Sequence, residues 1–126
     1  MKANIENGRA LVLVGPQGCG KTKLAIELAK AVGPYQEIEL SQLEDPFQNW
    51  MAPEIETVVV EGFPDRPALL NRVKQWVSAS HMEVNRKMRP VEIMRTPNFV
   101  FCTCDPEPLK HLEGRRFHVV DLAAAG

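Results

Sequence analysis

The sequence lacks any long hydrophobic run. None of its apolar stretches approaches the ~18 residues of a membrane-spanning helix, and residues 1–7 lack the apolar core of a secretory signal. We therefore expect a cytoplasmic protein with no membrane partner. A chain of 126 residues also predicts a single domain over 1–126, with 1–8 and 122–126 as flexible ends.

Cysteine is scarce, and its spacing argues against two classes of protein. Three cysteines cannot all pair, so we expect free thiols rather than a disulfide framework. No C-x-x-C spacing is present, which argues against a zinc site. Cys102 and Cys104 stand two apart in a predicted strand, where small buried cysteines are usually packing residues.

Net charge is also small, at −1, so nothing attracts the whole chain to nucleic acid. The charge is nevertheless uneven, because residues 66–95 hold 7 Lys/Arg against 2 Asp/Glu, whereas residues 1–65 hold 5 against 10. Charge alone leaves two explanations of this basic segment open, a solvated helix face with its loop or a surface that binds phosphates.

Short apolar runs alternate with helical patterns along the chain. Strands are predicted at 9–14, 37–40, 57–60, 98–104 and 117–120. Apolar spacing predicts one helix from Lys21 to the stop at Gly33, and another from an Asp65 N-cap to about Ser80. Phe47 and Trp50 are expected core contacts, and 82–94 is either a hairpin or a loop. This order predicts an α/β fold with an open, mostly parallel sheet flanked by helices.

Residues 15–22, GPQGCGKT, match G-x-x-x-x-G-K-[ST] between a predicted strand and a predicted helix. The glycines let backbone N–H groups and the helix N-terminus face the phosphates of a nucleoside triphosphate. Lys21 is expected to reach the β and γ phosphates of ATP, and Thr22 to place its hydroxyl on Mg²⁺. The predicted nucleotide contacts are Gly15, Pro16, Gln17, Gly18, Cys19, Gly20, Lys21, Thr22 and Lys23.

Candidate catalytic residues follow the later strands. Glu61 ends a buried strand, where an acid can hold Mg²⁺ or orient the attacking water, although a surface carboxylate is the alternative. Asp65 is a reserve acid that capping explains as well. Thr103 is expected to face the γ phosphate or the attacking water. Arg115 and Arg116 are either a solvated pair or a source of a guanidinium for the nucleotide of a neighbouring subunit.

Taken in order, these segments resemble the ATPase core of superfamily-3 helicases, AAA+ motors in replication proteins of small viruses, phages and plasmids. The matching segments are 15–22 for Walker A, 58–61 for Walker B, 81–89 for the basic B′ segment with its DNA-contacting hairpin, 97–104 for the strand to sensor 1, and 113–120 for the arginine-finger segment. The family usually ends Walker B with two adjacent acids, whereas Gly62 follows Glu61 here.

The resemblance implies a homo-oligomeric ring such as a hexamer, with ATP and Mg²⁺ as cofactors. It also implies single-stranded or forked DNA as a partner, held by Arg86, Lys87 and Arg89. A separate initiator or primase chain is a further expected partner, and the bacterial host cytosol is the expected location if the chain is encoded by a phage or plasmid.

Three functions remain open on the sequence. The first is a helicase-like ATPase that acts on DNA. The second is a small-molecule P-loop kinase, in which the basic segment is an acceptor site or lid. The third is a nucleotide-dependent binding module with little hydrolysis, which the missing second acid would permit.

Overall fold

The computed structural model describes residues 10–112 and 116–122. Arg115 lies outside these residues. The two ends for which we expect flexibility, 1–8 and 122–126, also lie outside them, except for Leu122. The elements of the central sheet and its helices are β1 (Ala10–Val14), α2 (Lys21–Val32), β2 (Tyr35–Glu39), α3 (Leu40–Glu44), β3 (Thr57–Glu61), α4 (Pro67–Ser78), β6 (Asn98–Thr103), the 3₁₀ turn η1 (Glu107–His111) and β7 (Phe117–Asp121).

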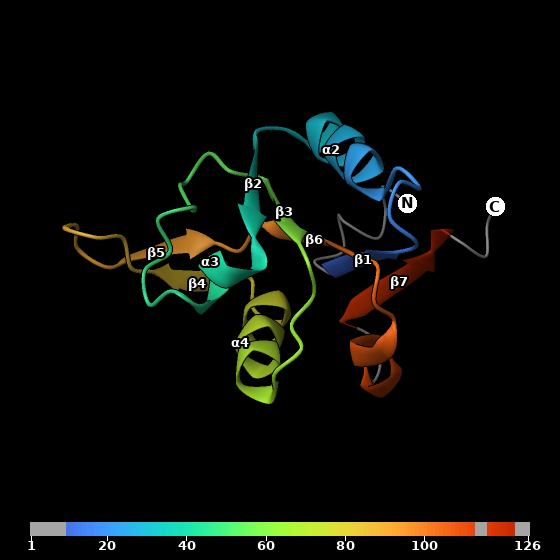
Figure 1. The fold of residues 1–126 in the computed structure, drawn as a ribbon. Helices are drawn as coiled ribbons and strands as arrows, with labels where there is room; N and C mark the ends of the chain where they lie inside the picture. Colours follow the sequence, from blue (N-terminus) through green and yellow to red (C-terminus); the bar gives the residue numbers. More distant parts are fainter. Residues whose placement is uncertain (1–9, 113–115, 123–126) are drawn as a thin grey trace.

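Five parallel strands form one sheet in the order β2-β3-β6-β1-β7. A separate antiparallel hairpin, β4 (His81–Val84) with β5 (Glu92–Arg95), stands between α4 and β6 in the chain. The predicted α/β fold with a mostly parallel sheet is confirmed, and segment 82–94 is a hairpin rather than a loop. Figure 1 shows the hairpin projecting from the end of the sheet that is away from the glycine loop.

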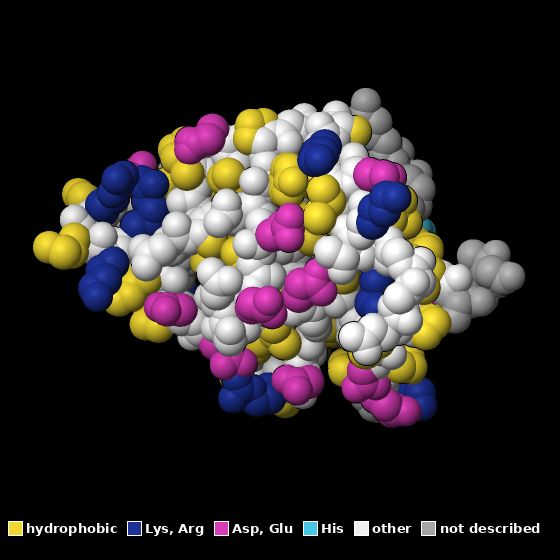
Figure 2. All heavy atoms as spheres, turned by 45° about the horizontal axis from the view of Figure 1, so that its top comes forward, with side chains coloured by type: hydrophobic (Ala, Val, Ile, Leu, Met, Phe, Trp, Pro, Cys, Tyr) yellow, Lys and Arg dark blue, Asp and Glu magenta, His cyan; other side chains and the backbone are white. Residues whose placement is uncertain are grey.

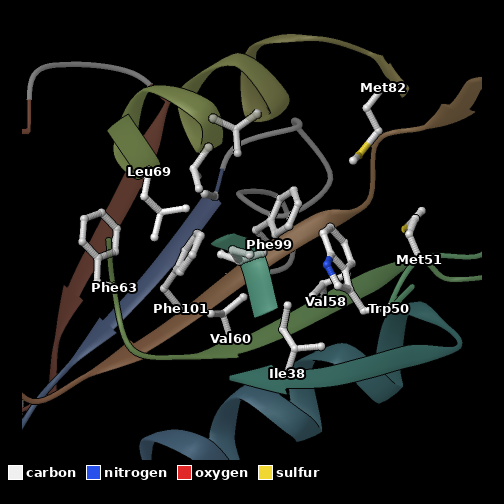
Figure 3. Packing of buried hydrophobic residues seen from close by; sticks show 14 of the residues in the cluster. Ile38, Trp50, Met51, Val58, Val60, Phe63, Leu69, Met82, Phe99 and Phe101 are labelled. Atoms are coloured by element: carbon white, nitrogen blue, oxygen red, sulfur yellow. The ribbon is translucent and has the colours of Figure 1, made fainter. Parts of the chain in front are cut away.

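Helices cover both faces of the sheet, which explains why the middle residues of the central strands are apolar without alternation. On one face Ala25 and Ala29 of α2 pack in a cluster with Leu11, Leu13, Val59, Val100 and Cys102. On the other face α4 packs in a larger cluster whose members include Val12, Val58, Val60, Leu69, Val73, Val77, Phe99 and Phe101. Successive residues of one strand thus belong to opposite layers. Figure 3 shows Phe99 and Phe101 at the centre of the larger cluster.

Aromatic rings attach the segment 45–51 to this larger cluster. The Trp50 ring lies edge-on to Trp76 of α4 and to Phe99 of β6, with centroid distances of 5.7 and 6.2 Å. Such aromatic pairs add about 0.5–1.5 kcal/mol each beyond the area they bury. Trp50 is therefore the core contact that its sequence pattern predicts, whereas Phe47 is only partly buried. The packing holds this segment beside the hairpin.

The predicted N-cap of the second helix is wrong. Arg66, not Asp65, is the N-cap of α4, and it makes no side-chain cap hydrogen bond. Pro67 occupies the first turn, where its missing N–H costs nothing, and this fixes where the helix starts without a polar cap. The helix ends at Ser78, two residues before the predicted boundary, and Asp65 is exposed.

Two further boundaries differ from the sequence prediction. The strand expected at 37–40 spans Tyr35–Glu39, and the short helix α3 follows it directly. A capping box starts α3, since the Gln42 side chain accepts a hydrogen bond from the Glu39 N–H at 2.9 Å. At the same edge of the sheet β6 stops at Thr103, so Cys104 is exposed beyond the strand and is not a packing residue.

Candidate nucleotide site

The glycine loop, residues 15–20, joins β1 to α2 at the carboxyl edge of the sheet. Gly18 and Gly20 have φ of 85° and 88°, a conformation that side-chain-bearing residues rarely adopt. A Cβ at either position would meet nothing within 4 Å, so backbone conformation rather than space requires glycine there. No acid occupies the first turn of α2, and its N-cap has no side-chain hydrogen bond, so the N–H groups at this terminus can face an anion.

A cavity of about 520 Å³ opens in front of this loop. Its lining comes from the loop with the start of α2, from the end of β3 and from the end of β6. The residues are Gln17, Gly18, Gly20, Lys21, Thr22, Lys23, Glu61, Gly62, Cys102, Thr103 and Cys104. The fold thus brings the predicted phosphate loop, Glu61 and Thr103 to one site, although they are far apart in the sequence.

Thr22 and Glu61 meet at the floor of this cavity. The Thr22 hydroxyl donates a 2.7 Å hydrogen bond to the Glu61 carboxylate, and both side chains are partly buried. A hydroxyl and a carboxylate this close are the hard oxygen donors that Mg²⁺ prefers, and Mg²⁺ usually keeps several waters beside one or two protein ligands. The pair therefore fits a magnesium ion bound together with a nucleotide phosphate.

Gly62, the residue after Glu61, occupies a position where a second acid would be strained and tightly packed. Its φ is 111°, and a Cβ built there would lie 3.2 Å from the Leu40 Cβ of α3. Its N–H donates a 2.7 Å hydrogen bond to the Cys102 carbonyl, which continues the contact between β3 and β6. The backbone conformation at residue 62 thus favours glycine over the second acid of the two-acid pattern.

Lys21 lies over the loop that precedes it. Its ammonium group is 3.4 Å from the Pro16 carbonyl oxygen, to which it donates a hydrogen bond. Such a bond to a neutral carbonyl is readily exchanged for one to a phosphate oxygen, because the negative charge of the phosphate attracts the ammonium more strongly than the carbonyl dipole does. Lys23 also lines the cavity and is exposed.

The end of β6 forms the far wall of the cavity. The Thr103 hydroxyl accepts a 3.2 Å hydrogen bond from the Asp105 N–H, so it helps to shape the turn after the strand. Burial, followed by the negative charge of Glu61, raises the pKa of the Cys102 thiol to about 12. Cys102 is therefore a neutral thiol at physiological pH and not a nucleophile. Sequence reasoning missed Cys102 and Gly62 as lining residues, and only their strand-end positions could have indicated them.

The predicted nucleic-acid residues lie on the hairpin loop, and none of them lines the cavity. The Arg86 guanidinium donates a 2.5 Å hydrogen bond to the Glu92 carboxylate, and its side chain is only 14% exposed. Lys87 and Arg89 are exposed, and no acidic side chain in the described part of the chain pairs with either. Arg116 is exposed just before β7, while Arg115 lies outside the described residues.

The strand order β2-β3-β6-β1-β7, with a glycine loop after β1 and an acid at the end of β3, defines a P-loop nucleoside-triphosphatase fold. Residues 11–101 match the family described as ATPase family associated with various cellular activities (AAA). The chain belongs to this AAA family.

Solved structures with similar folds include those of three different proteins. The apo C-terminal region of NrS-1 has a TM-score of 0.71 at 24% identity, over 90% of this chain and 28% of that one. NtrX from Brucella abortus in complex with ADP has a TM-score of 0.60 at 12% identity, over 97% and 33% of the two chains. JCV helicase has a TM-score of 0.56 at 18% identity, over 95% and 40%.

The chain thus spans between about a quarter and two fifths of the length of these structures. A search of curated proteins finds none that matches it. Among the residues that the structure describes, no helix is both long and apolar enough to span a bilayer.

Proposed function

We propose that this AAA-family chain binds and hydrolyses ATP with Mg²⁺, and acts as an oligomeric motor on DNA during replication of a phage, plasmid or other mobile element. In this proposal it is of the superfamily-3 helicase type and works in the cytosol of a bacterial host. The observation that carries the proposal is the course of β6. Two residues separate this strand from the hairpin of β4 and β5, whose loop carries Lys87 and Arg89, and the strand ends in the wall of the nucleotide cavity.

At the nucleotide end, the loop N–H groups and the start of α2 bind the phosphates. Lys21 turns from the Pro16 carbonyl to the β and γ phosphates. Thr22 and Glu61, 2.7 Å apart, hold the magnesium ion that neutralises the phosphate charge. Among the residues that the structure describes, Glu61 is also the one acid that lines this cavity, so orientation of the attacking water falls to it in this proposal.

At the hairpin end, Lys87 and Arg89 bind the phosphates of a single strand. Their ammonium and guanidinium groups are exposed and lack an acidic partner in the described residues, as such binding requires. Arg86 has a different task in this proposal, because its ion pair with Glu92 braces the loop instead of contacting DNA. DNA affinity should consequently depend on salt through Lys87 and Arg89 rather than through all three cations.

Coupling between the two ends is supported by the short connection from β5 to β6. Only Thr96 and Pro97 separate the hairpin from β6, and Thr96 is tied back by a 2.9 Å hydrogen bond from its N–H to the Ser80 carbonyl. A shift of β6 caused by the state of the nucleotide would therefore move the base of the hairpin.

Assembly into a ring is supported by the absence of an arginine from the described lining of the cavity. Its described lining holds two lysines and no arginine, whereas the charge that develops on the transferred phosphoryl group is commonly stabilised by a guanidinium. We assign this role to Arg115 or Arg116 of a neighbouring copy. In this proposal a separate initiator or primase is a further partner.

The test is phosphate release from ATP and Mg²⁺ at increasing protein concentration, with and without single-stranded DNA. Lys21→Ala is the blank, and Lys30→Ala is the matched control, since Lys30 is exposed on the same helix but lies in its last turn. Turnover that rises with DNA and more than linearly with protein concentration supports the motor. Turnover that neither DNA nor concentration changes would refute it, and phosphate transfer to a nucleoside or other metabolite would indicate a kinase.

A second candidate is a nucleotide-dependent binding module with little hydrolysis. The observation that favours it is Gly62, whose positive φ and close approach to Leu40 disfavour a second acid at the usual position. Tight ATP binding in equilibrium dialysis, without phosphate release at any concentration of protein or DNA, would select this candidate over the motor.

A further inference from the structure

The tip of the hairpin holds an unusual methionine. Met88 is 96% exposed, and it is the one non-glycine residue with positive φ, at 63°, in the part of the chain described. Left-handed backbone costs a side-chain-bearing residue about 1–2 kcal/mol, and glycine or asparagine normally occupies such a turn position. A large apolar side chain that is both strained and fully exposed contributes nothing to folding, so its presence suggests a contact outside the chain.

The loop around Met88 is held in place by a neighbouring segment. The Gln48 side chain, in a residue that is 4% exposed, accepts a 2.9 Å hydrogen bond from the Asn85 N–H. The Gln48 N–H in turn donates to the Asn85 carbonyl at 2.8 Å. Asn49 accepts a 2.9 Å bond from the Lys87 N–H, directly before Met88. These bonds keep the strained turn in one conformation and present Met88 outward before any ligand binds.

The surroundings of Met88 indicate what it contacts. Lys87 and Arg89 flank it, and Figure 2 shows Lys and Arg side chains gathered with apolar ones at the hairpin end of the molecule. The nearby Val91 is 57% exposed. A stable protein partner usually covers roughly 20–30 residues per side, whereas the exposed run at the hairpin tip is residues 87–91. Anionic groups that alternate with flat apolar faces are the chemistry of a single-stranded nucleic acid.

We propose that Met88 is a base-contacting residue, and that its thioether side chain packs against the faces of bases in a single strand whose phosphates Lys87 and Arg89 hold. This inference rests on the DNA contact of the proposed function and adds to it a second, apolar type of contact. Base contact of this kind is insensitive to salt and tolerant of sequence, because every base has a π face. The hairpin thus contacts both the phosphates and the bases of a single DNA strand.

The test uses the full chain, a fluorescent single-stranded oligonucleotide and a salt series, with three variants. Met88→Gly removes the side chain and suits the positive φ, so its unfolding temperature should equal or exceed that of the wild type. Its affinity should fall about fivefold to tenfold at every salt concentration, with an unchanged slope of log K against log salt. Met88→Leu should retain the affinity, because leucine keeps the apolar bulk. Lys87→Ala should instead lower the slope by about 0.7.

A 2-aminopurine base in the oligonucleotide gives a direct reading of base contact. Its fluorescence should change when the wild type binds and should not change with Met88→Gly at saturation. Salt-dependent binding that Lys87→Ala weakens and Met88→Gly leaves intact would overturn the role of Met88 alone. No DNA binding by the wild type would refute the proposed function itself. Self-association lost in Met88→Gly, without DNA binding, would make the tip a protein contact and overturn this inference.

Discussion

Replacement of Gly62 by alanine tests whether the backbone itself excludes a second acid from the nucleotide site. The φ of 111° is one that residues with a side chain rarely adopt, and the new Cβ would lie 3.2 Å from the Leu40 Cβ. A sparsely populated conformation costs about 1–3 kcal/mol, and a tight new contact costs about 1–3 kcal/mol when its neighbour cannot move. Since Leu40 is only partly buried and can move a little, we expect a total of about 2–4 kcal/mol.

This loss should be visible in thermal unfolding followed by circular dichroism. For a domain of 126 residues, one kcal/mol corresponds to about 4 °C, so Gly62→Ala should lower the unfolding temperature by roughly 8–16 °C. Gly18→Ala is the matched control, because Gly18 also has positive φ but a Cβ there meets nothing within 4 Å. It should cost only the backbone part, about 1–2 kcal/mol.

Leu40→Gly separates the two parts of the cost. In that background the Leu40 Cβ, which would lie 3.2 Å from a Cβ at residue 62, is absent, so the added loss from Gly62→Ala should shrink to the backbone part. An unfolding temperature of Gly62→Ala equal to that of the wild type would refute this reasoning. So would a Gly62→Asp variant that folds normally and hydrolyses ATP faster, because it would show that an acid fits where the geometry excludes one.

Three further predictions follow from the site and the hairpin. Glu61→Gln should keep the fold but reduce magnesium-dependent phosphate release at least a hundredfold, measured beside the wild type in the same assay. Gln48→Ala leaves the partly buried Asn85 N–H without its partner and should cost about 1–3 kcal/mol in denaturant unfolding. The same variant should bind DNA more weakly at every salt concentration, because the loop is no longer held in one conformation. Iodoacetamide at pH 8 should alkylate the exposed Cys19 and Cys104 but not the buried Cys102, as mass spectrometry of the alkylated protein can measure. Saturating ATP should slow the alkylation of Cys104, because this residue lines the nucleotide cavity.

The sequence alone determined the fold class and the phosphate loop. Short apolar runs bounded by turn residues and an amphipathic α4 give a strong local signal, because the pattern of apolar residues directly reflects whether one face or both faces of an element are buried. The glycine loop is local as well, since Gly18 and Gly20 adopt the positive φ that only glycine accepts readily. The AAA family is confirmed, while the superfamily-3 type and the roles of Lys21, Glu61 and the arginines stay predictions.

The tertiary structure alone decided which of these residues meet. The 2.7 Å contact of Thr22 with Glu61 joins positions 39 residues apart, and it depends on β6 lying between β1 and β3, which no local pattern encodes. The same is true of Arg86, one of three similar cations in the sequence, which only the register of the hairpin places beside Glu92. Contacts such as those of Gly62 with Leu40 and Gln48 with Asn85 arise from packing between distant segments, so their energies exist only once the chain has folded.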